Sequence, residues 1–284
     1  MDKLIMAAPA KINLGLDILG KNTHGYHLVD MVMARISLCD EVCVEKTSES
    51  ISVSCDNPHI PDGEANIAYR AADAFFSAMP VRGGAKISIK KRIPQSAGLA
   101  GGSADAAAVL KLLNKLYETG LSDERLEKIA VKIGADVPYC LHSAFARAEG
   151  IGEKLTFIES PLLLSVVVVK PPISISTKWA YMEMDKKPIK MHPHIEQIIS
   201  YLKQGDQEGL MDSIGNVFYD RLGSRFSEIG QSRDKLMDSG AKVAMMSGSG
   251  PSVFGIFDSE EAAEEAVNVL KSQGLECYAG ATLS

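Results

Sequence analysis

A run of small residues at 94–108 is the part of this sequence best suited to chemistry. It reads PQSAGLAGGSADAAA and lies between an expected strand at 86–90 and a helical pattern at 103–117. Glycines let backbone N–H groups come close to a ligand, and a helix N-terminus adds roughly half a positive charge at the same place. We interpret the run as a phosphate-binding loop; a tight strand-to-helix turn packed with small residues is the alternative.

The loop matches neither of the two common nucleotide fingerprints. A Walker A loop requires a lysine directly after its last glycine, and no lysine follows these glycines. A Rossmann loop requires the spacing G-x-G-x-x-G, which is also absent. The sequence therefore predicts phosphate binding through backbone groups on a different kind of loop.

Two charged residues stand where an apolar residue would be ordinary. Lys11 interrupts the apolar, strand-like segment 4–19, where an unpaired ammonium group would be costly to bury. A lysine that extends to solvent from a strand edge is the alternative. Asn13 follows two residues later and shares its face of the strand. Asp136 lies in the apolar run GADVP, either as the cap of a short helix that contains Pro138 or as a site residue.

Composition narrows the class of partner. The 284 residues are 46% hydrophobic and 23% charged, with a formal net charge of −6. A negative net charge argues against nucleic acid as the main partner, because phosphate backbones bind basic surfaces. We interpret the short basic cluster at 90–92 as a solvated strand end, with a supporting role near bound phosphates as the alternative.

The five cysteines are scattered and contain no C-x-x-C pair, so neither a zinc site nor a thioredoxin-type site is predicted. This usage fits a reduced, cytoplasmic compartment. The longest apolar stretch, 162–169, is far shorter than a membrane span and is interpreted as a buried strand. We therefore expect a cytoplasmic protein without a membrane segment.

The elements expected around these residues indicate an α+β protein of two domains. Strand patterns precede a block of helices, and a mixed segment follows in which one helix separates antiparallel strands. The boundary is expected at the Glu159-Ser160-Pro161 segment, which gives domains 1–158 and 159–284. Strands are expected at 41–46, 51–55, 86–90, 163–170, 242–246, 252–257 and 277–279. Helices are expected at 66–78, 103–117, 123–133, 193–203, 225–239 and 260–273.

Three of these segments together resemble one kinase family, named after galactose, homoserine, mevalonate and phosphomevalonate kinases. Residues 9–16 (PAKINLGL) are similar to its first motif, 94–104 to its second and 247–255 (SGSGPSVFG) to its third, in the same order. The resemblance implies a two-domain kinase with an ATP-binding domain at 1–158, a substrate-side domain at 159–284, and the active site in the cleft between them.

Further segments narrow the resemblance within that family. GYH at 25–27, NIAYRAA at 66–72, GADVP at 134–138 and AEGIGE at 148–153 are similar to the members that act on a cytidine diphosphate-linked methylerythritol. Those members use ATP to phosphorylate the 2-hydroxyl of that small molecule in the non-mevalonate isoprenoid route. Residues 141–145 depart from their pattern. A kinase for another small alcohol and a non-catalytic sensor of the same fold are the competing hypotheses.

The resemblance also implies roles for individual residues. Asp136 is expected as the catalytic base and Lys11 as its partner that stabilises the transferring oxygen. Ser103 is expected to bind Mg²⁺, with Asp105 as a second ligand or merely a favourable acid near the helix start. Asn66 is expected at the adenine or ribose, or as a helix cap. The substrate residues implied are Asn13, Tyr26, His27, Thr177 and Tyr181, with Trp179 able to take the place of Tyr181. The ATP-binding loop residues implied are Pro94, Ala97, Gly98, Leu99, Ala100, Gly101, Gly102, Ser103 and Ala104. The assembly expected is a monomer or a homodimer.

Overall fold

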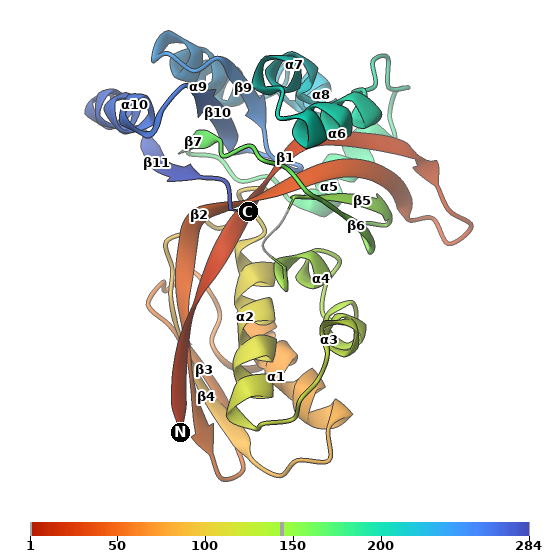
Figure 1. Cartoon of the computed structure of the whole chain (residues 1–284), viewed down its shortest axis with the longest axis vertical. Coiled ribbons are helices and arrows are strands. Elements are labelled where there is room, and N and C mark those ends of the chain that lie inside the picture. The colour runs from red at the N-terminus through yellow and green to blue at the C-terminus, as the bar shows by residue number, and fades with distance from the viewer. Residues whose placement is uncertain (1, 143–144, 284) are drawn as a thin grey trace. The chain divides into compact units, whose positions relative to one another are not determined.

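The structure is a computed structural model that describes residues 2–142 and 145–283, and Figure 1 labels its helices and strands. The chain forms two compact units. Unit 1 consists of Met1–Ala10, Cys39–Ile93 and Ala100–Ser143, and unit 2 of Lys11–Leu38, Pro94–Leu99 and Ala144–Ser284. The long strands β1 (Lys3–Lys21) and β2 (His27–Thr47) contribute residues to both units. The predicted division into 1–158 and 159–284 stays a prediction.

Unit 1 combines strand pairing with packed helices. β4 (Gly84–Lys90) pairs antiparallel with residues 41–47 of β2 and parallel with β3 (Ile51–Cys55). Helix α1 (Ile67–Ala78) buries one face, because its small and apolar residues recur at helical spacing, and it packs against α2 (Gly101–Leu116). Three short helices complete the unit: η1 (Gly63–Ala65), α3 (Asp123–Ala130) and α4 (Val137–Cys140).

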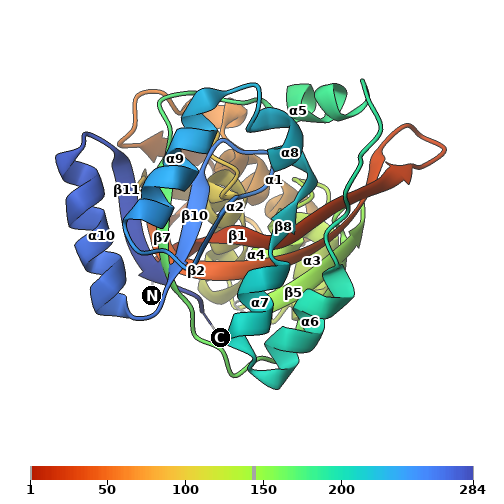
Figure 2. The ribbon, with the colours of Figure 1, turned by 90° about the horizontal axis from the view of Figure 1, so that it is seen from above.

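Unit 2 contains a four-stranded antiparallel sheet in the order β11-β7-β10-β9. The valine run of β7 (Ser165–Lys170) is buried at every position, and a strand pairs with β7 on each side. Helices α9 and α10 pack beside this sheet, as Figure 2 shows. The other strands are β5 (Phe145–Gly150), β6 (Lys154–Ile158), β8 (Gly215–Asn216), β9 (Val243–Met246), β10 (Val253–Phe257) and β11 (Glu276–Ala281). The helices are α5 (Thr177–Met184), α6 (Ile195–Gln204), α7 (Gln207–Ser213), α8 (Val217–Leu222), α9 (Ser227–Asp238) and α10 (Glu260–Ser272).

The predicted α+β class and the antiparallel pairing of the late strands are confirmed. The short elements β5, β6, β8, α7 and α8 were not predicted, and two further differences have a clear physical reason. β2 is far longer than the predicted strand at 41–46, because residues 29–36 are buried at every position and show no alternation. Helix α5 was not predicted, since TKWAYMEM is short and mixes polar and apolar residues without a clear period.

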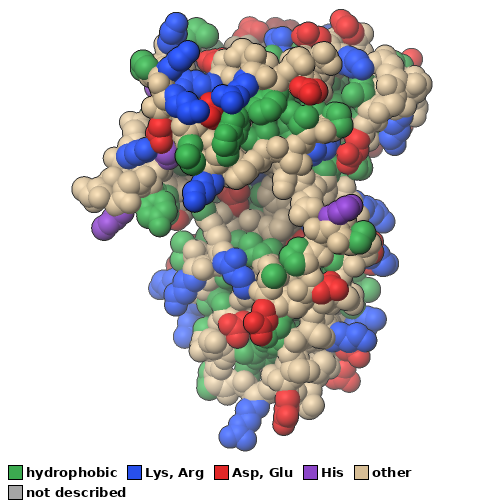
Figure 3. All heavy atoms as spheres, turned by 180° about the vertical axis from the view of Figure 1, so that it is seen from behind, with side chains coloured by type: hydrophobic (Ala, Val, Ile, Leu, Met, Phe, Trp, Pro, Cys, Tyr) green, Lys and Arg blue, Asp and Glu red, His purple; other side chains and the backbone are tan. Residues whose placement is uncertain are grey.

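Charged side chains of both signs are interspersed on the face drawn in Figure 3, and Lys and Arg side chains gather most closely at its upper left. Among the described residues, none of the helices combines the length and the apolar character needed to cross a membrane.

Candidate active site

The first half of the glycine-rich loop, residues 94–99, is held in unit 2 by contacts from distant parts of the chain. The backbone N–H of Lys11 donates to the carbonyl of Leu99 at 3.0 Å, and the Ser247 hydroxyl donates to the carbonyl of Gly98 at 2.9 Å. Gly98 has φ +76°, and an added Cβ would lie 2.1 Å from the Ser247 carbonyl oxygen. Only glycine suits this position, because both its backbone conformation and the space around it exclude a side chain.

The glycine turn at 247–250 approaches the same lysine from another direction. Gly248 has φ +57°, and an added Cβ would lie 3.2 Å from Lys11 Nζ. The buried Asn216 side chain holds this turn, since its Nδ2 donates to the carbonyls of Met246 at 2.7 Å and Gly248 at 2.9 Å. The three motifs noticed in the sequence therefore meet around Lys11 within unit 2.

Lys11 and Asn13 form a buried polar pair on one face of β1. Lys11 Nζ donates to Asn13 Oδ1 at 2.5 Å, and Asn13 Nδ2 donates to Met31 Sδ at 3.3 Å. The two residues are only 4% and 0% exposed. A buried ammonium needs such partners, and this one is held close to a glycine turn through which a ligand can approach.

The second half of the loop opens α2 in unit 1. Ala100 has the left-handed conformation (φ +55°) at the N-cap position and carries no side chain able to cap the helix. The first backbone N–H groups of α2 therefore have no side-chain acceptor from the cap. An added Cβ on Gly101 would lie 3.3 Å from Lys91 Nζ, so the helix start lies close to a cation. This is the arrangement that favours an anion.

A buried ion triad of Asp40, Lys91 and Asp105 supports that helix start. Lys91 Nζ contacts Asp105 Oδ2 at 2.7 Å and also pairs with Asp40, and the three side chains are 6% exposed or less. Asp40 Oδ1 in turn accepts the backbone N–H groups of Arg92 at 2.6 Å and Ile93 at 2.8 Å. The triad thus joins the chain before the loop to the first turns of α2.

Burial and mutual contact shift the pKa values of Asp105 and Lys91 in this triad. Burial raises the pKa of Asp105 to about 7, although Lys91 opposes the shift. Asp105 Oδ1 is a buried oxygen without a hydrogen-bond partner among the described residues. Burial lowers the pKa of Lys91, but the two aspartates outweigh this effect and raise it overall.

The structure corrects part of two expectations about these residues. The prediction of a solvated strand end holds for Lys90, whose side chain is 66% exposed and pairs with Glu41. It fails for Lys91, whose side chain is buried. Asp105 is not a first-turn acid facing solvent; it is a buried partner of Lys91. Sequence alone offered no signal for Asp40, because its partners lie about fifty residues away.

Asp136 lies immediately before α4 with backbone angles of φ −84° and ψ −10°, and its side chain makes no capping hydrogen bond. Within 2–142 and 145–283, this half-buried carboxylate has no hydrogen bond or ion pair to the protein. A helix-capping role for Asp136 therefore lacks its hydrogen bond, and the carboxylate is available to a ligand. The pairing of Asp136 with Lys11 stays a prediction.

Asn66 does cap a helix. Its Oδ1 accepts the N–H of Ala68 at 2.9 Å at the start of α1, and its Nδ2 donates to the Pro61 carbonyl at 2.9 Å. One N–H and one lone pair of the amide remain, so a contact to adenine or ribose stays a prediction. Ser103 is half-buried in the first turn of α2.

An aromatic pair forms a separate part of unit 2. The rings of His27 and Tyr181 lie 4.6 Å apart, centroid to centroid, at 32°. His27 Nε2 lies 2.9 Å from Asp185 Oδ1, and Lys21 Nζ donates to Asp185 Oδ2 at 2.7 Å. His27 and Asp185 line a cavity of about 500 Å³. Lys21 and Asp185 were not predicted, because an isolated lysine and an aspartate at a helix end form no recognisable pattern in the sequence.

The neighbours of Tyr181 decide between it and Trp179. Trp179 instead packs against Phe226 (5.7 Å) and lies under the Arg225 guanidinium (5.0 Å). Tyr181 is therefore the ring that accompanies His27. Tyr26 is 62% exposed.

The remaining predicted substrate residue joins the glycine turn. The Thr177 hydroxyl lies 3.1 Å from the Ser249 hydroxyl. Residues 141–145 are the stretch that departs from the pattern of the similar family members. Residues 143 and 144 lie outside the described residues, and Leu141 and Phe145 are buried.

Comparisons with known proteins identify the family of this chain. The model of the GHMP kinases N terminal domain matches residues 66–144, and that of the GHMP kinases C terminal domain matches 198–275. A 4-diphosphocytidyl-2-C-methyl-D-erythritol kinase of Acetivibrio thermocellus is 42% identical over 283 residues, which cover 100% of both chains. The enzyme of the same name from Clostridium botulinum (strain Alaska E43 / Type E3) is 40% identical over 97% of this chain and 99% of that one.

Two solved structures share the fold of this chain. A crystal structure of 4-(cytidine 5'-diphospho)-2C-methyl-D-erythritol kinase matches with a TM-score of 0.86 at 32% identity, covering 99% of this chain and 100% of that one. Homoserine kinase from Cytophaga hutchinsonii has the same fold, with a TM-score of 0.80 at 18% identity over 99% and 95% of the chains. The chain therefore belongs to the GHMP kinase family, and within it to the group of 4-diphosphocytidyl-2-C-methyl-D-erythritol kinases. It is a small-molecule kinase, and membership in this family implies ATP as the phosphoryl donor.

Proposed function

We propose that this kinase transfers the γ-phosphoryl group of ATP to the 2-hydroxyl of 4-diphosphocytidyl-2-C-methyl-D-erythritol, a step of the non-mevalonate route to isoprenoid precursors. The single observation that carries the proposal is the pair of His27 and Tyr181 rings, 4.6 Å apart and tilted at 32°, beside a cavity of about 500 Å³. An aromatic face with a hydrogen-bonding edge suits a nucleobase. Curated relatives named for this substrate, about 40% identical over the full chain, support it.

ATP is assigned to the loop residues 94–104 and Asn66. The uncapped start of α2 offers backbone N–H groups and a positive helix end to the phosphates. The nearby Lys91 ammonium is paired with Asp40 and Asp105, so the backbone N–H groups and the helix end supply the positive potential. Asn66 retains an N–H and a lone pair for adenine or ribose while it caps α1.

Phosphoryl transfer then requires a base and charge stabilisation. Asp136 is assigned as the group that orients and deprotonates the 2-hydroxyl, because its carboxylate has no bond to the described protein. Lys11 is assigned to the transferring oxygen, where its ammonium offsets the negative charge that develops. Its position beside Gly98 and Gly248 brings that charge to two glycine turns that can approach phosphate.

The other substrate contacts are assigned to five side chains. Asn13 sits beside Lys11 and would hydrogen-bond the polyol. Thr177 lies at the 247–250 turn, where its hydroxyl can reach a phosphate. The base would rest against Tyr26, His27 and Tyr181; the exposed Tyr26 is free to fold over it.

Mg²⁺ is assigned to the hydroxyl of Ser103, in the first turn of α2. The donor set fits, since Mg²⁺ prefers oxygen ligands and usually takes most of them from the nucleotide phosphates and water. Bound there, it would neutralise charge on the phosphates. The protein is further assigned to the cytoplasm, where ATP is available, as a monomer or homodimer without a nucleic-acid partner.

The test is ADP release by the purified protein with ATP, Mg²⁺ and 4-diphosphocytidyl-2-C-methyl-D-erythritol, with homoserine and mevalonate as competing acceptors. We expect turnover with the cytidyl substrate alone, and a loss of about 100-fold or more in kcat for Asp136→Asn. Asp123→Asn, at an exposed aspartate that begins α3 in the same unit, serves as the matched control and should retain activity. Turnover of another acceptor, or full activity of Asp136→Asn, would contradict the proposal.

A further inference from the structure

Asp185 has contacts that determine the protonation of its neighbour. Its carboxylate accepts hydrogen bonds from Lys21 Nζ at 2.7 Å and faces His27 Nε2 at 2.9 Å. The hydrogen bonds from Lys21 and then His27 lower the pKa of Asp185, so it stays ionised near neutrality. An ionised carboxylate can only accept hydrogen bonds.

The His27 ring must therefore donate from Nε2. In a neutral imidazole, a proton on Nε2 leaves Nδ1 as a bare acceptor. Within the parts of the chain that the structure describes, Nδ1 has no protein partner. The ring thus presents an unoccupied lone pair.

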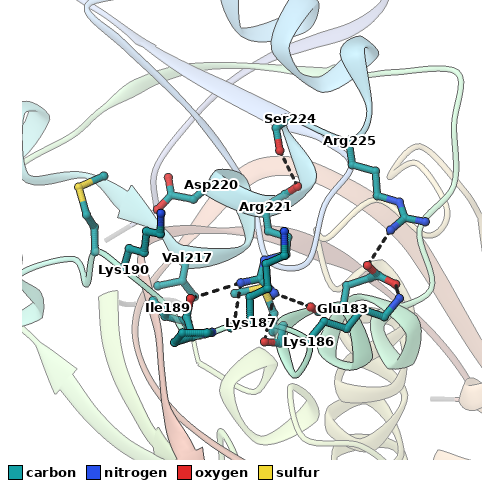
Figure 4. A pocket seen from close by; sticks show the side chains of 13 residues that line it. Glu183, Lys186, Lys187, Ile189, Lys190, Val217, Asp220, Arg221, Ser224 and Arg225 are labelled. Atoms are coloured by element: carbon teal, nitrogen blue, oxygen red, sulfur yellow. Dashed lines mark hydrogen bonds and ion pairs between the residues drawn. The ribbon is translucent and has the colours of Figure 1, made fainter.

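Helix α8 holds the segment that carries Asp185. The Arg221 guanidinium donates to the backbone carbonyls of Glu183 at 2.7 Å and Lys187 at 2.8 Å, on either side of Asp185 (Figure 4). Phe218 of the same helix meets the Tyr181 ring edge-on at 5.0 Å. Because both the carboxylate and the covering ring are anchored to α8, the orientation of His27 is set before any ligand binds.

We propose that Asp185 is a positioning residue that sets base specificity, by making His27 Nδ1 an acceptor for the exocyclic amine of a cytosine base. Uracil carries a carbonyl oxygen at that position, and two acceptors facing each other repel. The inference rests on the proposed function for the identity of the base. The inference goes beyond the proposed function because it names a residue that does not touch the base. It also gives the physical reason why uridine nucleotides are rejected.

The first experiment reads the tautomer directly and needs no substrate. Two-bond ¹H–¹⁵N spectra of the imidazole rings are recorded at pH 8, and the His27 signals are assigned by their loss in His27→Ala. The expected result is a proton on Nε2 in the unmodified protein and a loss of that preference in Asp185→Ala. A proton on Nδ1 in the unmodified protein would overturn the proposal.

The second experiment measures binding of CDP and UDP by calorimetry. The unmodified protein is expected to prefer CDP by about 100-fold, because a site built to bond one partner strongly rejects the mismatched one. Asp185→Ala should reduce that preference about tenfold or more, whereas Asp212→Ala, at an exposed aspartate of α7, should leave it unchanged. In the His27→Ala background, removing Asp185 should cause no further loss of preference, since the effect acts through the ring.

These outcomes separate the inference from the proposed function. Turnover of the cytidyl substrate with an Nδ1 proton, or with an unchanged CDP preference in Asp185→Ala, would overturn the role of Asp185 and leave the function standing. A missing turnover with the expected tautomer and CDP preference would overturn the function alone. Equal affinity for CDP and UDP, or binding of neither, would overturn the inference.

Discussion

The hydroxyl of Ser247 donates a hydrogen bond of 2.9 Å to the carbonyl of Gly98, a residue 149 positions earlier in the chain. This bond joins two glycine turns that are each ordinary in isolation. It also explains why position 98 needs glycine, since an added Cβ would lie 2.1 Å from the Ser247 carbonyl oxygen. The hydrogen bond therefore stabilises the junction of the two turns within the fold.

Gly98→Ala tests this junction. Gly98 and Gly274 have nearly equal φ angles (+76° and +80°), but an added Cβ at Gly274 meets nothing within 4 Å. Gly274→Ala should lower the free energy of unfolding by about 1–2 kcal/mol, the strain of a left-handed alanine. Gly98→Ala should cost at least about 2 kcal/mol more, because backbone must also move. Urea unfolding measures both, and equal costs would show that the contact with Ser247 is unimportant.

Lys91 and Lys90 are adjacent lysines in opposite environments. Lys91→Met would leave Asp40 and Asp105 buried without their cation, and such a loss typically costs about 3–5 kcal/mol. Lys90→Met removes only an exposed pair with Glu41 and should leave the free energy of unfolding almost unchanged. Chemical denaturation of the two variants compares them directly. Similar costs would refute the structural role of the triad.

The triad also predicts a pH dependence. Because burial raises the pKa of Asp105 from 3.8 to about 7, the folded state keeps a proton that the unfolded state releases in this range. The stability that this group contributes is therefore full at low pH and is lost as the pH rises toward 7. Asp105→Asn should gain stability relative to the unmodified protein between pH 5 and pH 8. Unfolding curves at four pH values would test this, and a constant difference between the two proteins would contradict it.

Tyr181 and Trp179 offer a matched pair on one helix. Tyr181→Ala should raise KM for the cytidyl substrate about tenfold or more, since stacking on a base contributes about 1–3 kcal/mol. Trp179→Ala removes packing against Phe226 and should lower stability with little change in KM. Steady-state kinetics with ADP detection distinguish the two. A larger KM effect in Trp179→Ala would reverse the assignment.

Local chemistry explains which candidate site residues could be singled out from the sequence. Residues 94–104 were noticeable because glycines and alanines accumulate there, and glycine allows the backbone to come close to a ligand. Lys11 and Asn13 were noticeable because polar groups in an apolar strand need partners, and they are each other's partners. Asn66 stayed ambiguous in the sequence, and the structure shows that it caps α1.

The residues that the sequence could not reveal act across long chain separations. Asp40 meets Lys91 over 51 positions, His27 meets Asp185 over 158, and Asn216 holds the turn at Gly248. Each is an ordinary polar residue whose own neighbours carry no pattern. Its role depends on which strand or helix it faces once packed.

By itself, then, the sequence indicated the kinase class through its resemblance to a known family. It indicated the glycine turns and the lysine between them through backbone freedom and the cost of burying charge. Only the tertiary structure decided which groups support them: the ion triad behind α2, the ring that accompanies His27, and the carboxylate that orients it. Hydrogen bonds and ion pairs are short-range and directional, so their partners are chosen by the folded geometry and not by position along the chain.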